Sequence, residues 1–276
     1  MSATAPLPLR RLRPARPLDL RALRSTPPRQ PGRTLSRLRV QLADGAWTTL
    51  HVATYDRARW GLRVAALARA LPLVQWCAEQ GVGDAVVGGF FQRSRGLPLG
   101  ELHVDGRAVY GIPFDPPWGA RRACVRVTGE RVLIGRRPDL DAGAGGDLLQ
   151  AGPLLLRDGV PVPDDDDHEG FSAGSHQFDS DITAGRYPRA ALGCDEDRLI
   201  AVAGDGRTRR DAGMTLEELA LALAALGARD ALNLDGGGSA SLVCGGRLRN
   251  RPREEHGVDL LGGRPIRTAL TFQPRG

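Results

Sequence analysis

Apolar and polar positions alternate along much of the chain, which is the pattern of short, half-buried β-strands. Three pairs of such segments flank a two-residue turn, and each pair predicts a β-hairpin. The pairs are residues 38–42 and 47–54 around Asp44-Gly45, residues 101–104 and 108–112 around Asp105-Gly106, and residues 122–128 and 131–134 around Gly129-Glu130. The apolar run AVVGGFFQ at 85–92 predicts a further, buried strand that contains a glycine pair.

Helical periodicity is visible in two segments. Residues 73–80 follow Pro72 and stop at Gly81, as expected for a short helix. Thr215 and Glu218 have the spacing of a capping box, and the leucines after them recur every three or four residues until Gly227. Strands are expected around this helix at 199–203, 231–234 and 240–244. We therefore expect an α+β fold with a mixed, largely antiparallel β-sheet core and a few flanking helices.

The positive charge of the chain is concentrated at its N-terminal end. The formal net charge is +6, but residues 1–39 hold ten arginines and one acidic residue, a local charge of +9 that leaves −3 for the rest. We expect residues 1–37 to form a flexible, Arg/Pro-rich extension and residues 38–276 to form one domain. The acidic balance of the domain argues against a nucleic-acid-binding protein. The extension itself fits either a solvated tail or an arm for nucleic acid or a membrane surface.

All 38 basic residues are arginine. The absence of lysine excludes Schiff-base enzymes, P-loop NTPases and protein kinases, because each of them needs a lysine in a defined role. The four cysteines lie far apart with no CxxC spacing, so we expect reduced, buried thiols. No apolar run is long enough to span a membrane, and the arginine pair at 10–11 lacks the following apolar segment of an export signal. From these features we expect a cytoplasmic protein.

The segment from Pro161 to Pro188 shows neither helical nor strand periodicity, and we expect a long loop there. It is rich in groups that bind metals: Asp164 to Asp167, His168, Glu169, His176, Asp179 and Asp181. Their spacing matches no metal-ligand motif, so a solvated loop is the first interpretation and a divalent-cation site the second. We expect no cofactor to be required, with a divalent cation as the alternative.

In the stretch NLDGGGSASLV at 233–243, Asp235 follows a short apolar strand and precedes three glycines and Ser239. Consecutive glycines lose much backbone entropy on folding, which suggests that a ligand or another strand lies against bare backbone there. The N–H groups of Gly236, Gly237 and Gly238 fit an anion-binding nest, and a tight hairpin is the alternative. An acid and a hydroxyl on the same turn favour a functional site.

Other polar residues belong to this site only by their position relative to a motif. Asp205 and Arg207 follow a predicted strand in GDGR, Arg189 begins RAALG, and Arg264 lies in GGRPIRTAL. In a chain with so many arginines, each one taken singly is expected at the solvated surface.

Residues 204–243, GDGRTRRDAGMTLEELALALAALGARDALNLDGGGSASLV, resemble the catalytic core of the phosphodiester glycosidase family. The resemblance extends through PRAALG at 188–193, AGPLLLRDG at 151–159, GGFF at 88–91 and GGRPIRTAL near the C-terminus, so it covers about residues 38–273 in the same motif order. The NLDGGGS element is the specific one, and the others support it.

The resemblance implies a phosphodiester glycosidase domain at 38–276 that hydrolyses the bond between a sugar's anomeric carbon and a phosphodiester. The substrate would be a sugar phosphodiester or phosphoglycan, and the products a free sugar and a phosphomonoester. By match of motif, the implied catalytic residues are Asp235 and Asp205. The implied substrate-binding residues are Arg189, Arg207, Asn233, Gly236, Gly237, Gly238, Ser239, Arg264 and Gly89. One position departs from the family: Val87 stands where an asparagine is usual, which affects recognition of the sugar.

The residues also suit the chemistry that the resemblance implies. A phosphomonoester has a second pKa of about 6 and leaves as a stable dianion, so it needs neutralisation of charge more than a proton. Arginine binds phosphate oxygens bidentately and stays charged. We therefore hypothesise that Arg189, Arg207 or Arg264 holds the phosphate together with the N–H groups of residues 236–239. Asp235 or Asp205 would activate water or attack the anomeric carbon.

Two other functions remain open from the sequence. One is a noncatalytic carbohydrate- or phosphate-binding domain of the same fold, in which Val87 reflects lost activity. The other is a nucleic-acid-associated protein that binds through its basic extension.

Overall fold

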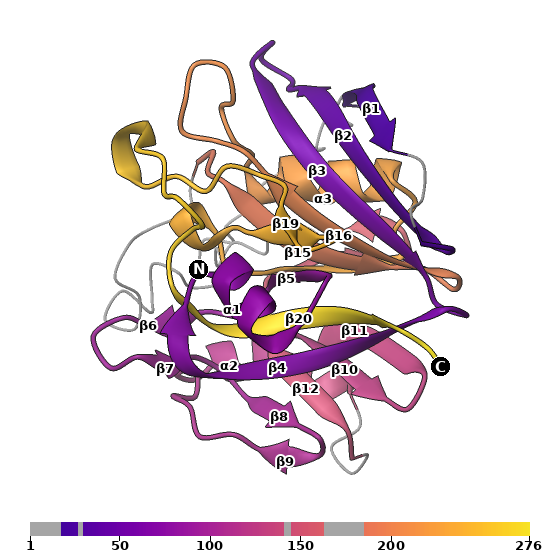
Figure 1. Cartoon of the computed structure of the whole chain (residues 1–276), viewed down its shortest axis with the longest axis vertical. Helices are drawn as coiled ribbons and strands as arrows, with labels where there is room; N and C mark the ends of the chain where they lie inside the picture. The colour runs from indigo at the N-terminus through magenta and orange to yellow at the C-terminus, as the bar shows by residue number, and fades with distance from the viewer. Residues whose placement is uncertain (1–17, 27–29, 141–144, 163–184) are drawn as a thin grey trace, which may run out of the picture.

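The computed structural model describes residues 18–26, 30–140, 145–162 and 185–276. Within these ranges the chain forms three β-sheets, a two-stranded ribbon and three short α-helices (Figure 1). The largest sheet has eight strands in the order β1-β2-β3-β16-β15-β17-β13-β14. Their bounds are β1 (Asp19–Thr26), β2 (Arg33–Gln41), β3 (Trp47–Asp56), β13 (Leu154–Arg157), β14 (Val160–Pro161), β15 (Arg189–Cys194), β16 (Arg198–Gly204) and β17 (Asp230–Asn233).

The two smaller sheets have five strands each. One has the order β11-β10-β12-β8-β9, with bounds β8 (Leu102–Val104), β9 (Arg107–Ala108), β10 (Ala123–Thr128), β11 (Arg131–Arg136) and β12 (Asp147–Gln150). The other has the order β19-β18-β5-β20-β4, with bounds β4 (Trp60–Leu71), β5 (Ala85–Val87), β18 (Leu242–Cys244), β19 (Arg247–Leu248) and β20 (Ile266–Pro274). The ribbon pairs β6 (Phe91–Gln92) with β7 (Leu97–Pro98).

Neighbouring strands in the described part of the chain pair antiparallel, and the parallel contact found is an isolated bridge between Leu99 and Ile112. The expected largely antiparallel core is confirmed, but the expectation of a mixed sheet is wrong. Strands β16 and β17 flank a helix and run in the same direction. They do not pair because β15 lies between them and is antiparallel to both.

Both helices predicted from the sequence are confirmed. Helix α1 (Leu73–Gln80) begins after Pro72 and ends at Gly81, which has a φ of 68°. Helix α3 (Leu216–Ala225) begins with the complete capping box of Thr215 and Glu218 and is followed by left-handed Gly227. The remaining helical segments are α2 (Trp118–Arg121) and the 3₁₀ turns η1 (Arg137–Asp139), η3 (Gly237–Ser239) and η4 (Glu255–Gly257).

Both faces of the central strands of the eight-stranded sheet are buried. Along β15, Ala190 and Leu192 belong to the core shared with the smaller sheets, whereas Ala191 packs in the cluster that contains Leu219 and Leu223 of α3. Because side chains alternate across a strand, this sheet separates two apolar clusters. Its central strands are therefore nearly continuous apolar runs in the sequence.

The three predicted hairpins form, with some changed bounds. The strand expected at 108–112 shortens to β9, and the one expected at 85–92 breaks after Val87. At the break only glycine fits, since a Cβ atom on Gly88 would lie 2.5 Å from the hydroxyl oxygen of Thr268. The expected boundary between extension and domain, at residues 37 and 38, falls inside β2, and β1 also precedes it. Residues 1–17 lie outside the described ranges.

The four cysteines are free and buried, as expected. Burial raises the pKa of the Cys77, Cys194 and Cys244 thiols to about 12, so these groups stay protonated at neutral pH. In the described ranges, no helix has both the length and the apolar character to cross a membrane.

A buried ion pair links the largest sheet to the sheet that contains β5. The Arg33 guanidinium of β2 donates to Asp84 Oδ2 at 2.7 Å, and the Tyr55 hydroxyl of β3 donates to Asp84 Oδ1 at 3.1 Å. The backbone carbonyl of Asp84 also accepts from the N–H of Phe272 in β20. One residue before β5 thus holds three strands of two sheets.

Replacing Asp84 with alanine should lower the free energy of unfolding by about 3–5 kcal/mol, because the Arg33 charge would remain buried without its partner. Urea unfolding of the purified protein measures this loss. Glu79→Ala breaks an exposed ion pair with Arg69 and serves as the control that should leave the midpoint nearly unchanged. Equal midpoints for the two variants would show that the buried pair does not hold the sheets together.

Candidate active site

The glycine turn after β17 carries the chain from one sheet to another. Strand β17 pairs with β13 and β15, whereas β18, which follows the turn, pairs with β5 and β19. Three backbone hydrogen bonds fix the turn: Asp235 N–H to Gly88 O at 3.0 Å, Gly237 N–H to Pro188 O at 2.8 Å, and Arg264 N–H to Gly238 O at 2.8 Å. The turn is therefore not the tight hairpin considered from the sequence.

The turn is not an anion-binding nest either. The N–H of Gly236 donates to Asp235 Oδ1 at 2.8 Å, that of Gly237 to Pro188, and that of Ser239 to Gly236 O at 3.1 Å. Three of the four N–H groups from 236 to 239 thus serve the protein's own acceptors, which argues against the nest, and phosphate binding by this set stays a prediction. The glycines suit the backbone of the turn instead: Gly237 has a φ of 59°, a left-handed conformation that favours glycine, and Gly238 leaves room for the Glu254 side chain.

The carboxylate of Asp235 lies in a buried position beside the turn, with the residue only 7% exposed. Burial raises its pKa to about 6, against smaller opposing effects from the Ser239 side chain, Arg264, the Gly236 N–H and Arg93. An aspartate with this pKa is largely ionised at neutral pH and still accepts a proton readily.

Arg207 and Arg264 converge on the same turn. A Cβ on Gly237 would lie 3.6 Å from Arg207 Nη2, and the Arg264 backbone is hydrogen-bonded to Gly238. Between the two arginines lies Glu254, which the sequence analysis did not single out. Arg264 donates to its carboxylate from Nε and Nη2 at 2.5 to 2.8 Å, and Arg207 Nη1 lies 3.9 Å from Oε2.

Arg189 does not share this arrangement. Its Nε donates to Met214 O at 2.8 Å and its Nη2 to Gly185 O at 3.1 Å, in a position that is 1% exposed. Burial lowers its pKa to about 10. Its guanidinium lies 5.7 Å from the ring of Tyr187, and that of Arg207 lies 5.5 Å from the same ring. These contacts favour a positioning role for Arg189 in the segment before β15, and its predicted contact with substrate stays a prediction.

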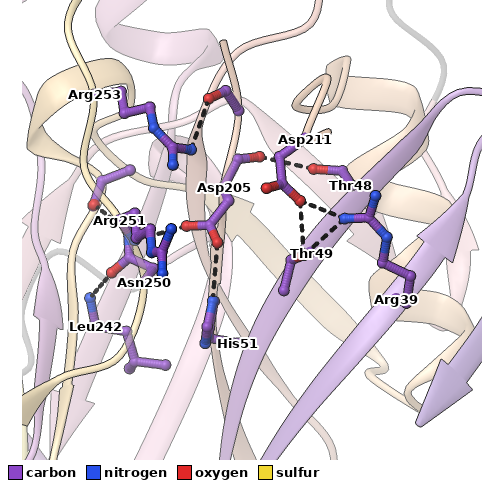
Figure 2. A network of polar contacts seen from close by, with 12 residues as sticks. Arg39, Thr48, Thr49, His51, Asp205, Asp211, Leu242, Asn250, Arg251 and Arg253 are labelled. Atoms are coloured by element: carbon purple, nitrogen blue, oxygen red, sulfur yellow. Dashed lines mark hydrogen bonds and ion pairs between the residues drawn. The ribbon is translucent and has the colours of Figure 1, made fainter. Parts of the chain in front are cut away.

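Asp205 is the centre of a buried polar network (Figure 2). Its Oδ1 accepts from the Arg251 N–H at 2.7 Å, its Oδ2 lies 3.2 Å from His51 Nε2, and its carbonyl accepts from the Thr48 hydroxyl at 2.7 Å. Arg253 adds a bond from Nη1 to Gly206 O at 3.2 Å. Both carboxylate oxygens are engaged, so the geometry favours a positioning role for Asp205, which joins the segment of Arg207 to the segment of Glu254.

The remaining predicted residues are buried around the turn. Asn233 donates from Nδ2 to Gly152 O at 3.2 Å and to Leu234 O at 2.9 Å, and Ser239 is fully buried. A Cβ on Gly89 would lie 2.9 Å from Gln150 O, so Gly89 is required by close packing of backbone. Val87 is fully buried in the apolar core.

The sequence analysis missed His51, Arg93 and Glu254. His51 interrupts an otherwise apolar stretch of β3, and this was the available signal for it. Arg93 follows the GGFF motif and acts electrostatically on both Asp235 and Glu254. Glu254 lies in a charged run, RPREEHG, that is typical of a solvated loop.

In the described ranges, no cluster of three or more histidine, cysteine or acidic side chains has the arrangement of a metal site. The candidate ligands at 164–181 lie outside these ranges, so the divalent-cation alternative stays a prediction.

The fold and site define a β-rich protein in which a buried carboxylate and two arginines meet at a glycine turn. The chain belongs to the phosphodiester glycosidase family, whose sequence profile matches residues 81–273. It is similar to N-acetylglucosamine-1-phosphodiester alpha-N-acetylglucosaminidase from Mus musculus, with 33% identity over 175 residues, and to that from Homo sapiens, with 31% identity over 175 residues. Each match covers 60% of this chain and about a third of the relative, 32% for mouse and 33% for human.

Two solved structures have a similar fold. The zebrafish N-acetylglucosamine-1-phosphodiester alpha-N-acetylglucosaminidase catalytic domain, auto-inhibited by its pro-peptide, superposes with a TM-score of 0.67 at 23% identity. That comparison covers 94% of this chain and 89% of the zebrafish chain. A hypothetical protein from Synechocystis gives a TM-score of 0.62 at 21% identity over 94% of this chain and 68% of the other. At these identities the likeness concerns the fold.

Replacing Asp235 with asparagine should stabilise the protein above pH 6. Burial raises the pKa of Asp235 from about 4 in the unfolded chain to about 6 in the fold. Ionisation of the buried carboxyl therefore lowers the free energy of unfolding progressively as the pH rises between these two pKa values. Above the higher value the loss reaches about 3 kcal/mol. Asparagine keeps the acceptor for the Gly236 N–H without the buried charge. The measurement is chemical denaturation at pH 4 and pH 8, and the stabilisation should shrink toward pH 4. A gain that does not depend on pH would contradict the raised pKa.

Proposed function

We propose that this protein hydrolyses the bond between the anomeric carbon of a sugar and the phosphate of a phosphodiester, releasing free sugar and a phosphomonoester. The main observation in support is the convergence of Arg207 and Arg264 on the turn that bears Asp235. Membership in the phosphodiester glycosidase family supports the reaction class. The names of the mouse and human relatives support a sugar 1-phosphodiester as the substrate class.

The arginines can neutralise the negative charge that develops on the phosphate in this reaction. As the glycosidic C–O bond breaks, both of its electrons stay with the phosphate, which leaves as a phosphomonoester dianion. Guanidinium groups fixed beside the phosphate stabilise the growing charge without reorganising at the moment of reaction. Because a phosphomonoester is a good leaving group, a second carboxylic acid to protonate it is not required, in contrast to ordinary glycoside hydrolysis.

Asp235 is the proposed general base. It would take a proton from the water whose oxygen forms the new bond to the anomeric carbon. A pKa of about 6 suits this role, since the group is ionised at neutral pH and remains more basic than a solvated aspartate.

The first test is the Asp235→Asn variant, which should lose turnover by about 10² to 10⁴ because the proton acceptor is removed. Release of N-acetylglucosamine from an N-acetylglucosamine 1-phosphodiester measures the effect, with circular dichroism as the check on folding. In ¹⁸O-labelled water, the wild-type protein should place the label in the sugar and not in the phosphate. Full activity in the variant would remove Asp235 from the mechanism.

The second test separates the arginines at the turn from the others. Arg264→Ala should lower kcat/KM by about 10² to 10³, since the charge it neutralises grows as the bond breaks. Arg198→Ala is the matched control: Arg198 is an exposed arginine paired with Asp195 at 2.6 Å, and its loss should leave kcat/KM unchanged. Equal kcat/KM values for both variants would exclude Arg264 from phosphate binding.

A further inference from the structure

The carboxylate of Glu254 pairs with the guanidinium groups of Arg264 and Arg207, which the proposed function assigns to phosphate binding. Arg264 donates to it through both Nε and Nη2, with distances of 2.5 to 2.8 Å, and Arg207 Nη1 lies 3.9 Å away on the other side. A bidentate guanidinium–carboxylate pair has the same fork geometry as a guanidinium–phosphate pair. One guanidinium fork cannot serve both anions in this way at the same time.

Glu254 is held as an anion in this position. Its pairing with Arg264, together with the charges of Arg207 and Arg93, keeps the pKa of its carboxyl below the ordinary value despite partial burial. It therefore carries a full negative charge at neutral pH, beside the turn where the phosphate would bind. A second anion arriving there is repelled unless the carboxylate moves.

The backbone around Glu254 allows the side chain to move by itself. The N–H of Glu254 donates to Val258 O at 2.9 Å, and Arg253 Nε donates to Asp259 at 2.6 Å, so the chain on both sides is anchored. The side chain of Glu254 is 31% exposed, which leaves a path toward solvent. On the inner side, the lack of a Cβ on Gly238 makes room for the carboxylate.

We propose that the Glu254 carboxylate competes with phosphate for the Arg264 guanidinium. It binds the guanidinium before substrate arrives, gives way to the phosphate of the substrate, and binds the guanidinium again when the product leaves. This inference rests on the proposed function for the identity of the anion. A phosphomonoester dianion binds arginine more strongly than the diester monoanion it comes from, so the reaction strengthens the hold on its own product. Competition from Glu254 weakens that hold and favours release.

The test is the affinity for inorganic phosphate, measured by isothermal titration calorimetry on the full chain. Glu254→Gln removes the competing charge and should tighten phosphate binding by about tenfold or more. Glu255→Gln is the matched control, because it removes the same charge from the next residue of the same loop and should change the affinity by less than about twofold. Glu254→Asp shortens the side chain by one methylene, and its affinity for phosphate should lie between those of wild type and Glu254→Gln.

A further variant locates the bound phosphate. In Glu254→Gln/Arg264→Ala the gain in affinity should disappear, since the guanidinium that Glu254 releases is gone. Phosphate binding that is unchanged or weaker in Glu254→Gln, in a protein whose thermal unfolding shows it to be folded, would overturn the proposal. If Glu254→Gln unfolds, Glu254→Asp decides in its place, and phosphate binding no tighter than that of wild type would overturn the proposal there.

These outcomes are independent of sugar release. Tighter phosphate binding without glycosidase activity would keep the anion competition and reject the proposed reaction. Sugar release without tighter binding would reject the competition alone.

Discussion

The site depends on the close approach of the glycine turn to the ends of neighbouring strands. Backbone hydrogen bonds from the turn reach Gly88 after β5, Pro188 before β15 and Arg264 before β20. The approach at Gly88 requires the absence of a side chain, because a Cβ there would lie 2.8 Å from the backbone carbonyl carbon of Thr268. The turn therefore joins the largest sheet to the sheet of β5 and β20, and brings residues distant in the sequence to one place.

The electrostatics follow from this packing. Asp235 is buried because the turn is held tightly against two sheets, and burial rather than a neighbouring anion is the main cause of its raised pKa. The arginines come from outside the strands, with Arg207 positioned through the Asp205 network and Arg264 through its own backbone bond to Gly238. The sheets thus fix the carboxylate, whereas the connecting segments supply and adjust the positive charge.

Features encoded by neighbours in the sequence could be predicted, and features made by distant contacts could not. The capping box of α3 and the hairpin of β2 and β3 depend on residues a few positions apart, and they form as expected. The N–H groups of the turn appeared available for an anion because nothing local showed that Pro188 would take one. Glu254 was missed for the same reason, since its partners Arg207 and Arg264 are separated from it in the chain. The motif predicts where the candidate site lies but not how its charges pair.

The segment between β19 and β20 has a consequence for how such a protein can change. It carries Glu254 and Arg264, and it is tied to β18 near its start, where the Arg249 N–H donates to Leu242 O at 2.9 Å and Asn250 Oδ1 accepts from the Leu242 N–H at 3.0 Å. Residues between these anchors and Arg264 can therefore change in charge while Asn250 and the Arg251 N–H keep the segment attached to β18 and to Asp205. The part of the loop around Glu254 is thus the place where the anion preference of the site can be redesigned while these anchors are kept.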